Sequence, residues 1–388
     1  MMSRNKQFRV LFRALIALSL LLCAPFLSGQ GLQPAASARV LANPAPPKPA
    51  HFLYIGKFPS TPELKINPST GALSFNKALN GVETTNGQVD GANKFLFATS
   101  YESGPKILVY SINQKTGDLT PVPGSPFSSD PNDVYAAMFI DPQGQFLYTS
   151  GEDVNSNINL TVFRMDRNTG VPTEVYRVGV PVQTTLGWVA TDVTGSFVYM
   201  GEPNQIYAYK SNKTSGALTP IAGSPFASRS AAMMASVHGY LYTMNSDGTL
   251  SGFSINSKSG ALKAVAGSPF NNKPQQWMSI DRVHNFLFTT NQYTIRTWRI
   301  NTKTGRLNLI AKSGGGKLHS PGTILADPSG KYVYVADYNQ SNCVFDQCVG
   351  ATNSYRINAS TGELTVVTNQ LLYPGDPYDN NFSISVAR

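Results

Sequence analysis

The chain repeats one short sequence unit seven times, and this repeat constrains its fold more than any other feature. Each unit contains a turn of the form Thr-Gly or Ser-Gly, and successive turns lie 44 to 57 residues apart. A period of about 45 residues is typical of a four-stranded β-propeller blade. The sequence therefore predicts seven blades. The glycines of the seven turns are Gly71, Gly117, Gly170, Gly216, Gly260, Gly305 and Gly362.

A second signature lies in register with these turns. Each unit has a short strand that begins with two aromatic residues around one aliphatic residue, in the form FLY, FLF, FVY, YLY or YVY. Alternation of side chains along such a segment is typical of a β-strand. In several units a turn with Asp-Pro or Gly precedes the strand, as in IDPQGQ and ADPSGK. The strands begin at Phe52, Phe95, Phe146, Phe197, Tyr240, Phe286 and Tyr332.

The two ends of the repeat region complement each other. HFLYIG, which begins at His51, reads as the second strand of a blade that lacks its first strand, and the chain ends on the strand-like NFSISVAR. The last segment can fill the gap, which would close the ring and leave no exposed sheet edge. We expect an all-β, seven-bladed β-propeller over residues 51–388, with four antiparallel strands per blade and the first blade closed by the C-terminal strand.

The N-terminus has the layout of a secretory signal peptide. Four basic residues precede the apolar run 14–27, and Ala36-Ser37-Ala38 offers a cleavage site. We expect a signal peptide over 1–38, a Pro-rich linker over 39–50, and a periplasmic or secreted mature protein with no stable membrane span. A retained anchor is the alternative, although the run is short for a membrane span. In an oxidising compartment Cys343 and Cys348 are expected to form a disulfide.

Charge and motifs narrow the ligand classes. The net charge of +9 includes four basic residues of the signal peptide, and the other basic residues are scattered singly, which argues against nucleic-acid binding. The series Asp153, Asn155, Asn157 is similar to the start of a calcium loop, but Ile158 stands where glycine is needed. We therefore expect no metal site. No cofactor is expected, and the protein is expected to be a monomer. We expect a small-molecule ligand, and the sequence leaves open whether a protein partner also binds.

Three repeated phrases resemble a known family. DPSGKYVYVADY (327–338), YSINQKTGDLTPVPGSPF (110–127) and FSINSKSGALKAVAGSPF (253–270) are similar to the seven-bladed lactonase family, which includes 6-phosphogluconolactonase and the carboxymuconate cycloisomerases. The resemblance covers essentially all of the mature chain. It implies a site in the central funnel, on the face that carries the crossovers between blades and the variable loops.

Counting along the repeat gives candidate side chains on that face. The residue five positions after the first aromatic residue of each strand is usually polar, and Glu152 follows one glycine of the series, Gly151. Trp188 and Trp277 share a second register, as platforms for a ring-shaped ligand or as packing between blades. The series is Lys57, Ser100, Gly151, Glu202, Asn245, Asn291 and Asp337.

The resemblance suggests one catalytic group, and position in the crossovers suggests two further candidates. Glu202 matches an acidic residue that lactonase relatives carry after the second strand of a blade, where a carboxylate can activate water. His319 is the one histidine in a crossover on the candidate face, and Arg229 is the best placed cation for a carboxylate or phosphate. The Pro-Arg-His stretch expected of phosphogluconolactone hydrolases is absent, because TTLGWVA (184–190) and DPNDVYA (130–136) contain neither Arg nor His.

Two functions follow from these residues. The first is an exported lactonase that acts on a small lactone or sugar acid, with Glu202 and His319 in catalysis. The second is a non-catalytic secreted or envelope propeller that binds a ligand or a protein, which the missing Arg-His stretch favours. Phosphogluconolactone is a cytosolic metabolite, so an exported enzyme would need another substrate.

Overall fold

The computed structural model describes residues 51–56, 60–99, 106–128, 134–153, 155–181, 187–229, 231–270, 275–291, 293–313, 318, 321–338, 350–373 and 383–387. The expected signal peptide and linker, His319, and the expected disulfide of Cys343 and Cys348 lie outside these residues. No helix long and apolar enough to cross a membrane occurs in the described part of the chain.

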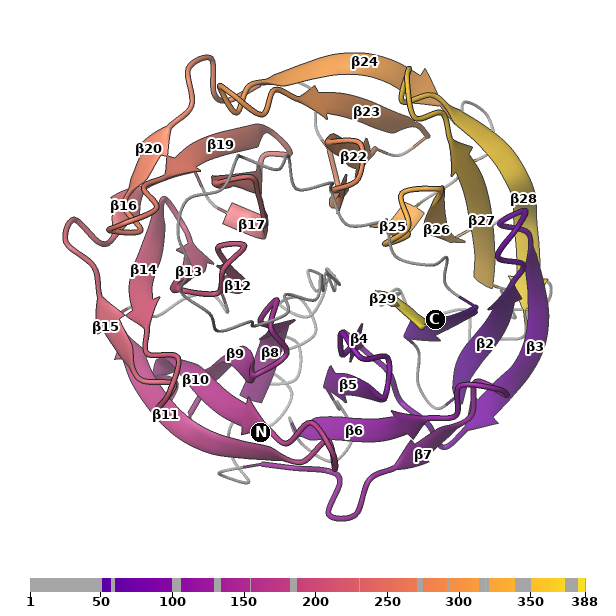
Figure 1. The fold of residues 1–388 in the computed structure, drawn as a ribbon, viewed down its shortest axis with the longest axis horizontal. Coiled ribbons are helices and arrows are strands. Elements are labelled where there is room, and N and C mark those ends of the chain that lie inside the picture. Colours follow the sequence, from indigo (N-terminus) through magenta and orange to yellow (C-terminus); the bar gives the residue numbers. More distant parts are fainter. Residues whose placement is uncertain are drawn as a thin grey trace, which may run out of the picture.

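Seven antiparallel sheets stand around one axis, as predicted from the repeat (Figure 1). We number the blades in chain order and give each from its inner to its outer strand. Blade 1 is β29 (Ser383–Ala387), β1 (Phe52–Gly56), β2 (Ser60–Ile66) and β3 (Leu73–Asn80); blade 2 is β4 (Gln88–Val89), β5 (Phe95–Thr99), β6 (Ile107–Ile112) and β7 (Leu119–Pro121). Blade 3 is β8 (Val134–Ile140), β9 (Phe146–Glu152), β10 (Ile158–Met165) and β11 (Pro172–Val180). Blade 4 is β12 (Trp188–Thr191), β13 (Phe197–Glu202), β14 (Gln205–Ser211) and β15 (Leu218–Pro220), with β16 (Phe226–Ala227) also paired to β14. Blade 5 is β17 (Ala231–Val237), β18 (Tyr240–Asn245), β19 (Leu250–Ile255) and β20 (Leu262–Ala264); blade 6 is β21 (Trp277–Asp281), β22 (Phe286–Thr290), β23 (Ile295–Ile300) and β24 (Leu307–Ser313). Blade 7 is β25 (Pro321–Ala326), β26 (Tyr332–Tyr338), β27 (Gly350–Ile357) and β28 (Leu364–Tyr373).

The C-terminal strand closes the ring in the way that the sequence predicted. β29 is the inner strand of blade 1 and pairs with β1 in a register that runs from Phe52 opposite Ala387 to Gly56 opposite Ser383. Every residue of β29 is buried. Joining the two ends of the chain in one sheet removes the open edges that a linear array of blades would expose.

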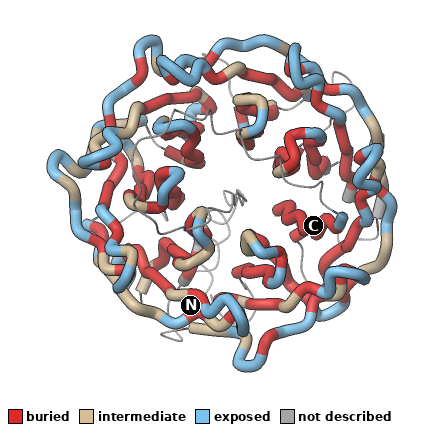
Figure 2. The backbone as a smooth tube through the Cα atoms, viewed as in Figure 1, coloured by how far each residue is buried: buried red, intermediate tan, exposed pale blue. Residues whose placement is uncertain are grey.

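The two ends of the ring axis differ. In each blade the inner strand begins where the second strand ends, as the pairs Trp188 with Gly201 and Trp277 with Thr290 illustrate. We call this end the crossover face. The Thr-Gly and Ser-Gly turns, which join third and fourth strands, lie on the opposite turn face. Figure 2 shows buried residues along the strands and exposed residues in the outermost loops.

The two sequence signatures are in register because they touch across each blade boundary. Every Thr-Gly or Ser-Gly glycine has a positive φ, and a Cβ added to it would meet the first aromatic residue of the second strand in the preceding blade. Glycine is therefore required both by the left-handed backbone and by the close approach. The pairs are Gly117 with Phe52, Gly170 with Phe95, Gly216 with Phe146, Gly260 with Phe197, Gly305 with Tyr240, Gly362 with Phe286 and, across the closure, Gly71 with Tyr332.

Tyrosine hydroxyls strengthen several of these contacts. The buried Tyr199, two residues after Phe197, donates to the carbonyl oxygen of Gly260 at 2.9 Å. Tyr54 and Tyr242 donate in the same way to the carbonyl oxygens of Gly117 and Gly305. The aromatic strand and the glycine turn thus form one repeated joint between neighbouring blades.

The phrase GSPF has a structural role in the three units that carry it. Its serine hydroxyl accepts a hydrogen bond from a backbone N–H of the third strand, at 3.0 Å for Ser125 with Val109, 2.9 Å for Ser224 with Ala208 and 3.0 Å for Ser268 with Gly252. The serine thus takes the place of the outer strand, which has only three residues in these blades.

Two kinds of aspartate turn should respond to pH with opposite signs. Asp141 is fully buried and accepts hydrogen bonds from the backbone N–H of Gln145 and Phe146; burial raises its pKa. Backbone N–H groups of Thr169 and Asn168 instead lower the pKa of the exposed Asp166.

A raised folded-state pKa means that the stabilising contribution of Asp141 is complete below the unfolded pKa, near 4, and is lost as pH rises through the folded value. Urea unfolding should therefore show Asp141→Asn gaining stability relative to wild type as the pH rises from about 4 to 7. The contribution of Asp166, whose folded-state pKa is lowered, is present above the unfolded pKa and lost as the pH falls, so Asp166→Asn should lose stability relative to wild type as the pH rises from about 3 to 5. The same sign for both variants would contradict this expectation.

Candidate functional site

Glu202 ends β13 on the crossover face and is 1% exposed. Val198 and Met200 alternate with it on the same side of the strand, and both belong to a core cluster shared with Phe146 and Tyr148 of blade 3. A Cβ added to Gly187 would lie 2.6 Å from Glu202 Oε1. The carboxylate therefore lies at the boundary between blades 3 and 4, against a backbone that only glycine leaves open.

Glu152 faces the same boundary from the other side. It ends β9, two residues after Ser150 and four after Tyr148, so alternation places the three side chains on one face. That face turns toward blade 4, because the Ser150 hydroxyl donates to the carbonyl oxygen of Gly187. Glu152 is half-buried. The sequence placed both carboxylates on the crossover face without indicating that they face one boundary.

Tyr207 adds a proton-bearing group that the sequence reasoning missed. The tight hairpin between β13 and β14 pairs Glu202 with Gln205, and the Gln205 side-chain amide donates to the Tyr207 hydroxyl at 3.0 Å. Burial and the nearby Glu202 carboxylate raise the pKa of Tyr207. The alternation in EPNQIYAY was the available signal, because Gln205 and Tyr207 share the face of their cross-strand neighbour Glu202. We call Glu152, Glu202, Gln205 and Tyr207 the carboxylate boundary.

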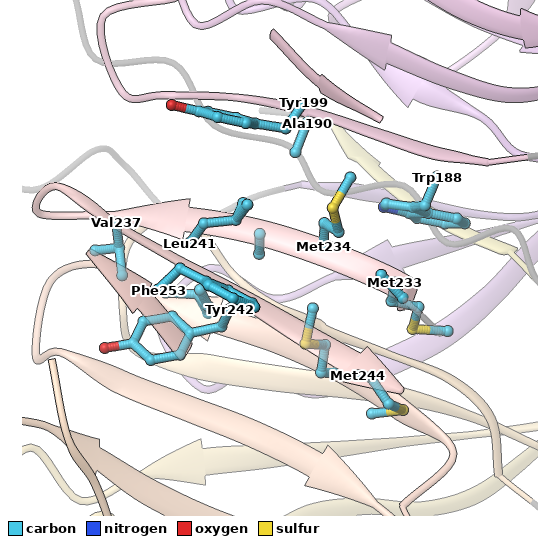
Figure 3. Packing of buried hydrophobic residues seen from close by; sticks show 14 of the residues in the cluster. Trp188, Ala190, Tyr199, Met233, Met234, Val237, Leu241, Tyr242, Met244 and Phe253 are labelled. Atoms are coloured by element: carbon cyan, nitrogen blue, oxygen red, sulfur yellow. The ribbon is translucent and has the colours of Figure 1, made fainter. Parts of the chain in front are cut away.

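The two tryptophans begin inner strands on the crossover face, in the shared register that the sequence predicted. Trp188 is 7% exposed and packs in a large core cluster with Met233 and Met234 of blade 5 (Figure 3). Trp277 is half-buried and packs against two clusters, one on each side of blade 6. Of the two tryptophans, Trp277 is the more exposed and therefore offers more surface to a ligand.

Asn245 and Asn291 hold their own turns. Asn245 accepts from the Thr243 hydroxyl, and its amide nitrogen lies 2.8 Å from Thr249 Oγ1 and 2.9 Å from Ser251 Oγ. The Asn291 side-chain oxygen accepts from the backbone N–H of Tyr293 and Thr294. Short polar side chains are favoured in turns for this reason, and it explains the amides in these positions.

Asp337 and Arg229 lie in different surroundings. Asp337 is fully buried near the end of β26 and contributes to the raised pKa of Tyr355, whose main cause is burial. Arg229 is more than half exposed and forms an ion pair with Asp247 at 2.7 Å. Exposed pairs of this kind contribute about 0.2–1 kcal/mol. Of the remaining predicted positions, Lys57, Ser100 and His319 lie outside the described residues.

Acidic turn residues do not assemble a metal centre in the described part of the chain, where no group of three or more His, Cys, Asp or Glu side chains is placed to hold an ion. The Asp153 carboxylate instead accepts hydrogen bonds from the backbone N–H groups of Asn155 and Asn157. The carboxylate boundary combines two carboxylates, an amide and a phenol. These groups can supply a base for a water molecule and hydrogen-bond donors for an oxygen atom.

Comparison with known proteins agrees with the repeat analysis. Residues 241–371 match the family model described as lactonase, 7-bladed beta-propeller. A search of the curated proteins found no match.

Solved structures share the whole fold. A Bacteroides fragilis protein provisionally designated a 6-phosphogluconolactonase has a TM-score of 0.65 and 14% identity, over 89% of this chain and 100% of that one. The periplasmic gluconolactonase of Pseudomonas aeruginosa has the same TM-score and identity, over 87% and 99%. At this identity the likeness concerns the fold.

Proposed function

From the seven-bladed propeller fold of this chain, and the match of residues 241–371 to the lactonase family model, we propose that the protein binds a small sugar lactone on its crossover face and opens the lactone ring by hydrolysis. The observation that carries the proposal is the carboxylate boundary, where Glu202 and Glu152 face one another's blades beside Tyr207. Two carboxylates of different exposure in one place suit a base and a substrate-orienting group.

Glu202 acts as the general base. Its carboxylate accepts a proton from a water molecule whose oxygen adds to the lactone carbonyl carbon. The tetrahedral intermediate then collapses, the bond from that carbon to the ring oxygen breaks, and the ring oxygen receives the proton as an alcohol. The product is a hydroxy acid, so atoms and charge balance without a cofactor. Tyr207 keeps its proton at neutral pH, because the ordinary pKa of tyrosine lies near 10 and burial raises the pKa of Tyr207 further, so its hydroxyl can donate a hydrogen bond.

The place of action is proposed to be outside the cytoplasm. The layout of residues 1–38 predicts a signal peptide, and one protein with the same fold is named a periplasmic gluconolactonase. An extracytoplasmic enzyme meets sugar lactones without a phosphate group, which fits a boundary whose charged groups are carboxylates. A phosphorylated substrate would be repelled by Glu152 and Glu202.

A crystal structure with a neutral δ-lactam analogue of a sugar lactone tests this site. The amide resists hydrolysis, so the analogue should remain bound between blades 3 and 4, with its carbonyl carbon one water molecule away from Glu202. Binding should be lost in Gly187→Val, whose side chain would collide with the Glu202 carboxylate and the Gly201 carbonyl oxygen, and kept in Gly239→Ala, which changes a hairpin on the turn face. A lactam bound elsewhere, or not at all, would refute the proposed site.

A further inference from the structure

Arg296 is a buried cation on the crossover-face side of blade 6. It is the second residue of β23, and its cross-strand partners are Thr289 in β22 and Lys312 in β24. Alternation places Arg296 on the same side as Trp298, which belongs to the core cluster shared with blade 5. The guanidinium therefore lies at the boundary between blades 5 and 6. Arg296 as a whole is 8% exposed.

No hydrogen bond or ion pair joins the side chain of Arg296 to another described residue, and its Nε is both inaccessible to solvent and without an acceptor. Burial lowers the pKa of Arg296, and no described carboxylate offsets that effect. Two other arginines have partners for their side chains. Arg177 pairs with Glu174, and Arg299 stacks over the Phe286 ring and donates to a carbonyl oxygen.

The polar side chains beside Arg296 form hydrogen bonds with one another. Thr289 Oγ1 donates to Gln275 Oε1 at 2.7 Å and accepts from Trp298 Nε1 at 2.9 Å. On the other side, the exposed Lys312 adds a second positive charge directly across the strand pair, where side chains lie on the same face. Two cations without a carboxylate repel each other, and a buried guanidinium stays charged at any physiological pH.

We propose that Arg296, with Lys312 at its outer edge, is an anion-binding site between blades 5 and 6 for the oxyanion of a small ligand, a carboxylate or a phosphate. The planar guanidinium presents parallel N–H donors that match the two oxygen atoms of such a group. An isolated buried charge is unfavourable, so the site gains stability when the anion supplies the missing acceptors. This site is separate from the carboxylate boundary, which lies between blades 3 and 4, and stands whether or not the protein is a lactonase.

Thermal unfolding at constant ionic strength tests the site, with inorganic phosphate and gluconate as separate probes. The melting temperature of the wild type should rise with the concentration of at least one probe. Arg296→Met should melt at a higher temperature than the wild type without a probe, because the uncompensated charge is gone, and should lose the response. Arg177→Gln, which removes an arginine already paired with Glu174, should keep the full response.

The two probes separate the sources of the anion. A response to gluconate alone identifies a carboxylate ligand, and a response to phosphate alone identifies a phosphate ester. If Arg296→Met does not fold, titration calorimetry of the wild type and of Lys312→Gln decides: the wild type should bind a probe, and the variant should bind it about two- to fivefold more weakly. No binding by the wild type, or an unchanged response in Arg296→Met, overturns the proposal.

Discussion

Gly260→Ala is expected to lower the free energy of unfolding by about 2 to 5 kcal/mol. Gly260 has a φ of +74°, and its alanine Cβ would overlap the Phe197 ring of the preceding blade. The left-handed backbone costs about 1–2 kcal/mol for a residue with a Cβ. Forcing a methyl group into a closely packed boundary costs about 1–3 kcal/mol more. The Tyr199 hydrogen bond to the Gly260 carbonyl oxygen holds the turn in place and limits its relaxation.

Gly239 provides the matched control. Its φ is +77°, but a Cβ added to it would meet no atom within 4 Å. Gly239→Ala should therefore show the backbone cost alone, about 1–2 kcal/mol. Urea unfolding of both variants beside the wild type measures the difference, which is the contribution of the contact between blades. Equal losses would mean that the glycine and aromatic signatures coincide without depending on each other.

The fold was predictable because its two signatures are local and repeated. Thr-Gly and Ser-Gly turns and aromatic strands can be counted along the chain, and their contact across each blade boundary explains why they recur together. Closure by the C-terminal strand was predictable for a similar reason. The first blade lacked its first strand in the sequence, and the C-terminal segment was a strand that belonged to no other blade. These features depend on backbone geometry, which a short sequence motif specifies.

The site was predictable only in part. Counting from the aromatic strands placed Glu202 and Glu152 on the crossover face, but the count treats each blade separately. Which neighbouring blade a side chain faces depends on the alternation in two adjacent blades. The count therefore did not predict that these two carboxylates face the same blade boundary. Asn245 was proposed for a ligand because it is polar, whereas its amide is used by Thr249 and Ser251. Polarity alone does not distinguish a ligand contact from a turn contact.

Arg296 escaped the count because it lies on a third strand. The counted positions were the ends of second strands and the starts of inner strands, and RTWRI reads as an ordinary outer segment with alternating polar residues. Its importance depends on burial and on the lack of a partner among the described residues. Neither property can be obtained from one sequence.

Glu202→Gln is expected to lower the rate of lactone hydrolysis by about 10²- to 10⁴-fold, the usual contribution of a general base. Glutamine keeps the size and hydrogen-bonding shape of the side chain but cannot accept a proton from water. The loss should therefore fall on kcat more than on KM. Folding should be preserved, because the substitution removes a charge from a side chain that is 1% exposed.

Glu363→Gln is the control for this experiment. Glu363 is exposed near a Thr-Gly turn on the turn face, where its carboxylate accepts a hydrogen bond from the Thr361 hydroxyl. This variant removes one negative charge from the protein without touching the carboxylate boundary. Its rate should equal that of the wild type, so a loss confined to Glu202→Gln is not an effect of net charge.

The rate of ring opening of neutral sugar lactones, followed by acid release at constant pH, tests the central claim most directly. The account predicts that the purified wild type and Glu363→Gln accelerate the opening of at least one such lactone above the spontaneous rate. The rate with Glu202→Gln should be lower than the wild-type rate by a factor of about 100 or more. A wild type that opens no sugar lactone, or a Glu202→Gln variant with the full rate, would contradict it.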